Sequence, residues 1–373
     1  MRYSTRVKIK KYVVIGILAM IFVAVNIWVF IKIAHPRTPL EKKLVELPIS
    51  VNGTAKAYEQ GALCIEGQTL ICYDLKKNEV FRTELQFEGM KAWRGNKYTV
   101  AWSEHFVAVY DEAGQLIVPK SMDNKTKVLS ARCADNSFSV LTMEEEQHWV
   151  HVYNMEAKEI DKMLFPEESV LDFGYYGEDN RQLWALSIDS HGTIPISHMK
   201  TYQPGKSLTG KIDVNDQICY KVIPMDKVIY TVGVHHIHTW GYDNKEKQEY
   251  HVYGWTLQDT LIDGKDKASF LMAPANTGNS ELPISAMWYI GSDKTQYRVS
   301  LPAGILRLML TDHGTYAVSK DGVYEYDLEG EQKRFYKMPF TITEIVDVVP
   351  GKAFIIKGKK MEEEKYYLLP VTK

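Results

Sequence analysis

The chain carries two patterns of hydrophobic and polar positions, and they meet near residue 43. Residues 12–31 form an apolar run without a charged side chain. Beyond residue 44, runs of roughly five to eight residues rich in Val, Ile, Tyr and Phe alternate with turns of Gly, Asn and Asp. Helical periodicity is almost absent there, so the pattern predicts an all-β body.

The β-rich runs repeat along the body. The clearest unit ends its third strand in Tyr-Asp and continues through a charged turn into a fourth strand, as at Tyr73-Asp74 and Tyr110-Asp111. These third strands lie about 42 residues apart, which is the spacing of four-stranded propeller blades. We expect each aromatic ring to pack between blades and each Asp to cap the turn that follows it. The predicted centres of the third strands are Tyr73, Tyr110, Tyr153, Met199, Tyr242, Tyr289, Tyr326 and Tyr367.

The repeats predict a β-propeller of about eight four-stranded blades over residues 44–373. Seven blades is the alternative, because the units between residues 171 and 304 are the least regular. The last unit has only three strands, and residues 44–51 form an extra strand before the first unit. We expect residues 44–51 to supply the outer strand of the last blade, where Pro48 is tolerated because an edge strand need not donate on its open side.

The segment 73–85, YDLKKNEVFRTEL, and its copies resemble the blade ends of quinoprotein-like and WD-repeat-like propellers. The arrangement also resembles uncharacterised bacterial families of membrane-anchored propellers. This resemblance implies the architecture only. Phe81 and Phe335 stand where quinoprotein blades carry a docking Trp, and the His and Trp-Asp of WD blades are missing, so no cofactor site is carried over.

The N-terminal region predicts a membrane anchor. A segment of 20 apolar residues spans about 30 Å as a helix, which matches a hydrocarbon core. Residues 1–11 are basic, and by the positive-inside rule they stay in the cytoplasm. We therefore expect a transmembrane helix over 12–33, a linker over 34–43 and an extracytoplasmic body. A cleaved signal peptide and a buried core helix are the alternatives.

The charge of the body limits its partners. Beyond residue 39 there are 38 Lys and Arg against 47 Asp and Glu. Nucleic-acid binding depends on neutralising phosphates, so we expect no nucleic-acid partner.

The four cysteines, Cys64, Cys72, Cys133 and Cys219, are too few for a disulfide scaffold. Cys64 and Cys72 flank a predicted turn, which leaves a cross-strand bridge as one alternative. The other alternative is that all four are small buried hydrophobic residues.

Candidate chemistry is sparse. His236 and His238 share a face if they lie in a strand, so they are the candidates for metal ligands, with a third ligand from another loop. The alternative is a polar hairpin, and we assign no metal, catalytic or cofactor site from the sequence. Residues 205–211 have the spacing of a phosphate-binding loop but lack its Ser or Thr, and the acidic triplets at 144–146 and 362–364 are typical of solvated turns.

These observations predict a membrane-anchored, extracytoplasmic propeller that acts as a non-catalytic interaction or ligand-binding module. Its expected partners are the membrane, through the N-terminal helix, and a protein or glycan on a propeller face. An extracytoplasmic enzyme, either a glycan-active hydrolase or a cofactor-dependent dehydrogenase, is the alternative. Facing carboxylates at the central channel would favour the hydrolase.

Overall fold

The computed structural model describes residues 40–177, 180–275 and 282–371. Residues from Leu44 onward form one compact unit, and one helical turn, α2 (Leu40–Lys43), precedes it in the chain. The predicted basic segment 1–11 and the predicted anchor 12–33 lie outside the described residues. Within the described ranges, no helix combines the length and the apolar character that crossing a bilayer requires.

The strands of the described body form seven hydrogen-bonded sheets. Five of these sheets each contain four antiparallel strands that are consecutive in the chain. In order they are β2 (Thr54–Tyr58), β3 (Gly61–Glu66), β4 (Thr69–Asp74) and β5 (Glu79–Glu84); β6 (Lys91–Arg94), β7 (Thr99–Ser103), β8 (Phe106–Tyr110) and β9 (Leu116–Ser121); β10 (Lys127–Cys133), β11 (Ser137–Glu144), β12 (Gln147–Asn154) and β13 (Glu159–Phe165); β14 (Glu168–Tyr176), β15 (Gln182–Asp189), β16 (Ile196–Gln203) and β17 (Ser207–Val214); β18 (Cys219–Pro224), β19 (Val228–Gly233), β20 (His236–Gly241) and β21 (Glu246–His251).

The other two sheets depart from this scheme. One has seven strands: β22 (Trp255–Asp263), β23 (Lys267–Pro274), β24 (Ile284–Ile290), β25 (Gln296–Thr311), β26 (Gly314–Ser319), β27 (Gly322–Tyr326) and β28 (Gln332–Lys337). The last combines β29 (Thr341–Val349), β30 (Ala353–Lys360) and β31 (Glu363–Pro370) with β1 (Val45–Glu46).

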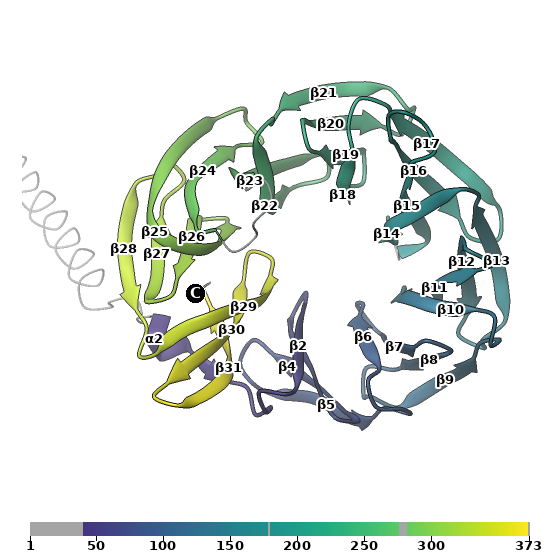
Figure 1. Ribbon diagram of the computed structural model, residues 1–373, viewed down its shortest axis with the longest axis horizontal. Helices are drawn as coiled ribbons and strands as arrows, with labels where there is room; N and C mark the ends of the chain where they lie inside the picture. The colour runs from purple at the N-terminus through teal and green to yellow at the C-terminus, as the bar shows by residue number, and fades with distance from the viewer. Residues whose placement is uncertain (1–39, 178–179, 276–281, 372–373) are drawn as a thin grey trace, which may run out of the picture. The chain divides into compact units, whose positions relative to one another are not determined.

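The sheets of residues 44–371 follow one another around a ring, and in each of the five regular sheets the first strand lies toward the centre and the last strand toward the rim (Figure 1). Hydrophobic clusters fill the spaces between neighbouring sheets. Because each sheet is covered on both faces, its middle strands are continuous apolar runs rather than alternating ones. Residues 107–110 of β8, for example, are all buried. The predicted propeller architecture is confirmed.

The number of sheets differs from the predicted eight because of β25, which is 16 residues long. Residues 296–300 of β25 pair with β24, and residues 305–311 pair with β26, with Ile305 opposite a residue of each neighbouring strand. One strand thus belongs to two successive repeats and joins them into a single sheet. The number of hydrogen-bonded sheets among the described residues is therefore seven, which matches the alternative prediction of seven blades.

The start of the chain's body closes the ring, as predicted. Val45 and Glu46 of β1 pair with Leu368 and Tyr367 of β31, which makes β1 the outer strand of the last sheet. The Leu47 amide donates to the Tyr366 carbonyl at 2.9 Å.

The Tyr-Asp pairs do what the pattern predicts in the regular repeats. Tyr73 and Tyr110 are buried. Asp74 and Asp111 each accept hydrogen bonds, at 2.8–2.9 Å, from the amides two and four residues later. A bulge lies beside each aromatic residue, because the fourth strand carries one extra residue between the partners of the aromatic residue and of the residue before it. The same position is occupied in six repeats, by Tyr73, Tyr110, Tyr153, Tyr202, Trp240 and Tyr326. The predicted centre Met199 lies within the third strand β16, three residues before the bulged position, whereas the predicted centre Tyr242 lies one residue beyond the end of β20 and two residues after Trp240.

The predicted alternative of a Cys64–Cys72 bridge is wrong. All four cysteines are buried free thiols. Cys64 pairs with Ile71 and Cys72 with Leu63, so the two cysteines point to opposite faces of the β2–β5 sheet.

Candidate functional site

A pocket of about 610 Å³ lies between the β14–β17 and β18–β21 sheets. Its floor is formed by buried apolar side chains: Met199 from β16, Ile212 from β17 and Ile229 from β19. Tyr176 and Tyr242 stand over this floor from the two sheets. The volume falls in the range of small-molecule sites.

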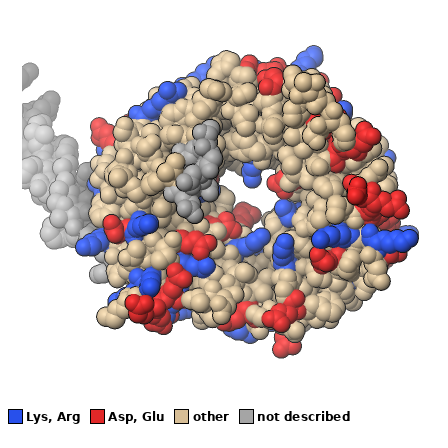
Figure 2. Space-filling model, in the orientation of Figure 1, with Lys and Arg blue, Asp and Glu red and all other residues tan. Residues whose placement is uncertain are grey.

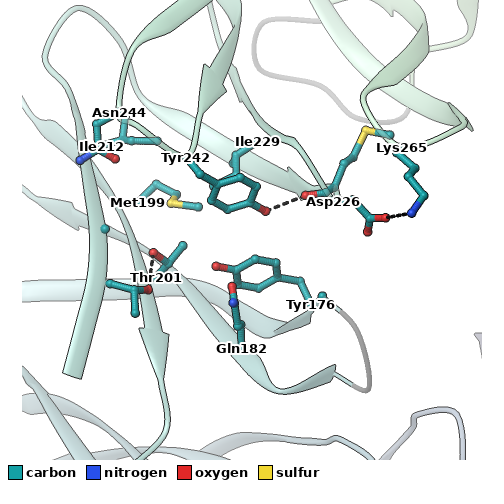
Figure 3. A pocket seen from close by; sticks show the side chains of 14 residues that line it. Tyr176, Gln182, Met199, Thr201, Ile212, Asp226, Ile229, Tyr242, Asn244 and Lys265 are labelled. Atoms are coloured by element: carbon teal, nitrogen blue, oxygen red, sulfur yellow. Dashed lines mark hydrogen bonds and ion pairs between the residues drawn. The ribbon is translucent and has the colours of Figure 1, made fainter. Parts of the chain in front are cut away.

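The two tyrosines are parallel and face each other across the pocket (Figure 3). Their ring centroids are 6.0 Å apart and their planes differ by 4°. The Tyr242 hydroxyl donates to the Met225 carbonyl at 2.6 Å, which fixes the ring over the pocket. Burial raises the pKa of Tyr176, and its contact with the Thr201 hydroxyl opposes that shift only in part. Both rings therefore present neutral hydroxyl groups near neutral pH.

Polar groups surround the apolar floor (Figure 3). The Thr209 hydroxyl donates to the Thr201 hydroxyl at 2.9 Å. Lys265 and Asp226 form an exposed ion pair of 3.3 Å at the rim. The amides of Gln182 and Asn244 complete the lining. The pocket thus offers hydrogen-bond donors and acceptors of several kinds around its apolar floor.

The local sequence explains why Tyr242 reaches this position. Trp240 occupies the inter-sheet position that the pattern assigned to Tyr242, and Gly241 follows it where regular repeats have Asp. A Cβ on Gly241 would collide with the Asp243 carboxylate. Glycine therefore makes room for the Asp243 carboxylate, while the turn keeps the backbone hydrogen bonds of the regular repeats, from the Gly241 amide to the Lys245 carbonyl and from the Asn244 amide to the Gly241 carbonyl. Tyr242, on this turn, is 42% exposed.

The predicted metal-ligand candidates, His236 and His238, both lie on β20. The structure brings them close to three carboxylates that the sequence analysis did not name: Asp216 from the β17–β18 loop, and Glu246 and Glu249 from β21. His238 is buried, and His236 is partly exposed.

The centre of the ring holds a second cavity, of about 600 Å³, lined by Arg94, Arg132, Lys221 and Asp172 from the innermost strands. The space-filling view shows an opening here, with Lys and Arg side chains around it (Figure 2). Arg132 pairs with Asp172 at 3.3 Å and lies over the Phe173 ring, 5.3 Å from its centroid.

Aspartates on the innermost strands join successive repeats. Asp259 of β22 accepts from the Leu310 amide of β25 at 2.8 Å, and Asp347 of β29 accepts from the Ala57 amide of β2 at 2.9 Å. Burial raises the pKa of Asp259 to about 6, although its backbone hydrogen bonds favour the charged carboxylate. These contacts assign both carboxylates a structural role.

The remaining sequence motifs are turns. Residues 205–211 belong to the β16–β17 hairpin, so the helix that a phosphate-binding loop requires is replaced by a strand. Residues 145–146 and 361–362 form the turns of the β11–β12 and β30–β31 hairpins, which matches the prediction for Glu145, Glu146 and Glu362. Glu144, Glu363 and Glu364 instead lie in the flanking strands, and Glu144 pairs with His151 and Lys162.

Comparison with known proteins agrees with the architecture. No protein-family model matches the sequence, and no curated protein does. The chain is similar to the Dos1 propeller, with a TM-score of 0.53 and 11% identity over 89% of this chain and 97% of that chain. It is also similar to a eukaryotic initiation factor, with a TM-score of 0.52 and 11% identity over 82% and 80%. For Hsv2 of Kluyveromyces lactis the TM-score is 0.50 and the sequence identity is 8%, over 77% of this chain and 100% of that chain.

The chain folds as a β-propeller. At these identities the likeness establishes the fold alone, so function must be argued from the propeller's own side chains. Sequence analysis placed none of the pocket residues at a site. The one signal in the sequence was Gly241, which interrupts the Tyr-Asp pattern at the repeat that presents Tyr242.

Proposed function

We propose that this protein is a membrane-anchored, extracytoplasmic propeller that binds a ligand without catalysis, in the pocket between the β14–β17 and β18–β21 sheets. The observation that carries the proposal is the pocket itself. It opens between two neighbouring sheets over a buried apolar floor, and its tyrosines come from two different sheets.

The lining favours a glycan segment as the ligand. Sugars combine hydroxyl groups with apolar C–H faces, so their sites need aromatic surface beside neutral donors and acceptors. Tyr242 supplies exposed aromatic surface, and Gln182, Asn244 and Thr209 supply amide and hydroxyl groups. The single ion pair at the rim adds no net charge, which disfavours a strongly charged ligand.

The non-catalytic part of the proposal is supported by the inner-strand aspartates. A glycoside hydrolase needs two carboxylates that face each other across the sugar. Asp259 and Asp347 each accept backbone amides from their own and the next repeat, and Asp172 is paired with Arg132. The carboxylate oxygens of these three aspartates are therefore used in contacts within the propeller.

The anchor and its orientation rest on the sequence. The apolar length of 12–33 and the basic residues of 1–11 favour a single pass with the body outside the cytoplasm. We also infer a count of eight blades, since β25 pairs as the fourth strand of one repeat and the first strand of the next.

The ligand proposal is tested with the full chain purified in detergent on an array of soluble oligosaccharides. We expect one glycan class to bind, and Tyr242→Ala to weaken that binding by about tenfold or more, since aromatic contacts dominate such sites. Tyr253→Ala is the matched control, because Tyr253 is 78% exposed and does not line the pocket. Absence of glycan binding, or binding that survives Tyr242→Ala, contradicts the proposal.

The orientation is tested separately by adding protease to intact cells. We expect the body to be digested while a cytoplasmic marker survives. A protected body would overturn the extracytoplasmic placement and would leave the ligand proposal intact.

A further inference from the structure

The cluster around His236 and His238 is arranged as a metal site. Three ligand atoms, Asp216 Oδ2, His236 Nδ1 and His238 Nε2, lie within 4.8 Å of one another. The carboxylate oxygen is 3.1 Å from His236 Nδ1 and 3.8 Å from His238 Nε2. Tetrahedral zinc with bonds of about 2.0–2.1 Å separates its ligand atoms by about 3.3 Å, so the two measured distances bracket the required spacing.

His238 provides independent evidence that a ligand belongs here. Its side chain is only 7% exposed. Its Nε2 atom is buried and has no hydrogen-bond partner among the described residues. A buried polar nitrogen without a partner is costly. A cation between His238 Nε2 and Asp216 would satisfy it.

The outer nitrogens of both rings are also arranged for metal binding. His236 Nε2 lies 3.3 Å from Glu249 Oε1, and His238 Nδ1 lies 3.3 Å from Glu246 Oε1. Metal-ligating histidines direct their second nitrogen to a carboxylate, which fixes the tautomer and orients the ring. Here each ring turns one nitrogen toward Asp216 and the other toward a glutamate of β21.

We propose that Asp216, His236 and His238 bind one divalent transition-metal ion, with Zn²⁺ as the preferred class, and that Glu246 and Glu249 orient the two imidazoles. Two imidazoles and one carboxylate suit zinc and its first-row neighbours rather than Ca²⁺ or Mg²⁺. A water or a partner group completes the fourth position. The ion ties the β17–β18 loop to β20, and this inference is independent of the proposed ligand pocket.

A competing set shares one of these residues. His236 can instead use its Nε2 with Glu249 and His251. Substitutions that remove a single set distinguish the two arrangements, because Asp216 belongs only to the proposed set and His251 only to the competing one.

The experiment uses the full chain in detergent after chelation and dialysis, titrated with ZnCl₂ by calorimetry and with CoCl₂ by absorption. We expect one tight equivalent, tetrahedral Co²⁺ bands, and two imidazole ligands in the zinc X-ray absorption spectrum. Asp216→Asn and His236→Ala should each weaken binding by at least about tenfold, and Glu249→Gln and Glu246→Gln by about 10–100-fold. His251→Ala and His191→Ala should leave binding unchanged, since His191 forms an exposed pair with Asp189 elsewhere.

Because Asp216 is exposed and His236 is partly exposed, their variants should fold, and an unchanged melting temperature in chelator checks this. Zinc should raise the melting temperature of the wild type and not that of Asp216→Asn, since a ligand that binds only the folded state stabilises it. Absence of a tight equivalent overturns the site. Loss of binding in His251→Ala with binding kept in Asp216→Asn overturns the ligand set.

Discussion

The β6–β9 sheet and the β18–β21 sheet are built from the same repeat, yet only the second departs from it at a surface. In β6–β9, Tyr110 is fully buried and Asp111 caps its turn with two short hydrogen bonds. In β18–β21, Trp240 is the packing residue, Gly241 replaces the capping position, and Tyr242 is exposed at a pocket. Where the repeat is kept, it specifies packing, and where it is broken, side chains become available for binding.

The largest expected difference in stability comes from replacing Tyr110 and Tyr242, the two tyrosines that the repeat pattern treats as equivalent. Tyr110→Ala should lower the free energy of unfolding by about 3–5 kcal/mol, because it leaves a cavity in a packed cluster. Tyr242→Ala should cost only about 1 kcal/mol, the value of its hydrogen bond to Met225. Urea unfolding followed by Trp fluorescence measures both, and equal losses would contradict the distinction between packing and pocket tyrosines.

The aspartates of the innermost strands provide a second test, because their contacts join successive repeats whether or not the repeat follows the Tyr-Asp pattern. Burial raises the pKa of Asp259 from 3.8 to about 6. The folded state therefore binds its proton more tightly than the unfolded state, and this contribution is fully present below pH 3.8 and lost as the pH rises through 6. Between pH 4 and 7 the free energy of unfolding should fall by at most about 3 kcal/mol more in the wild type than in Asp259→Asn. If the free energies of unfolding of the two proteins change with pH in parallel, the pKa of Asp259 is not raised in the folded state.

The smallest contrast concerns the two turn aspartates. Asp111→Ala should cost about 1–2 kcal/mol, because two amides lose a charged acceptor. Asp243 accepts one amide, from Lys245, at 3.4 Å, so Asp243→Ala should change the free energy of unfolding by less than about 0.5 kcal/mol. Thermal unfolding at a common pH compares them, and a larger loss for Asp243→Ala would reverse the expected order.

The sequence predicted the propeller, the closure by its first strand and the packing role of residues such as Tyr73 and Tyr110, because these depend on local periodicity. It did not identify Tyr202 and Trp240 as the residues at the bulged position, because Met199 and Tyr242 lie close by and no local rule ranks one candidate above another. His236 and His238 could be paired because residues two apart share a strand face. Asp216, Glu246 and Glu249 could not be found, because hairpin register and loop position bring them together.

The pairing of β1 with β31 has a consequence for biosynthesis. β1 is synthesised before β31, so it can pair only after residues 366–368 have left the ribosome. The intervening sheets can assemble in order before then, while β1 and the edge of β31 remain unpaired. Closing a loop of this length makes the final step entropically demanding and places it late. Until it happens, the nascent protein exposes strand edges that can pair with other chains, and its yield should therefore depend on chaperones that cover those edges.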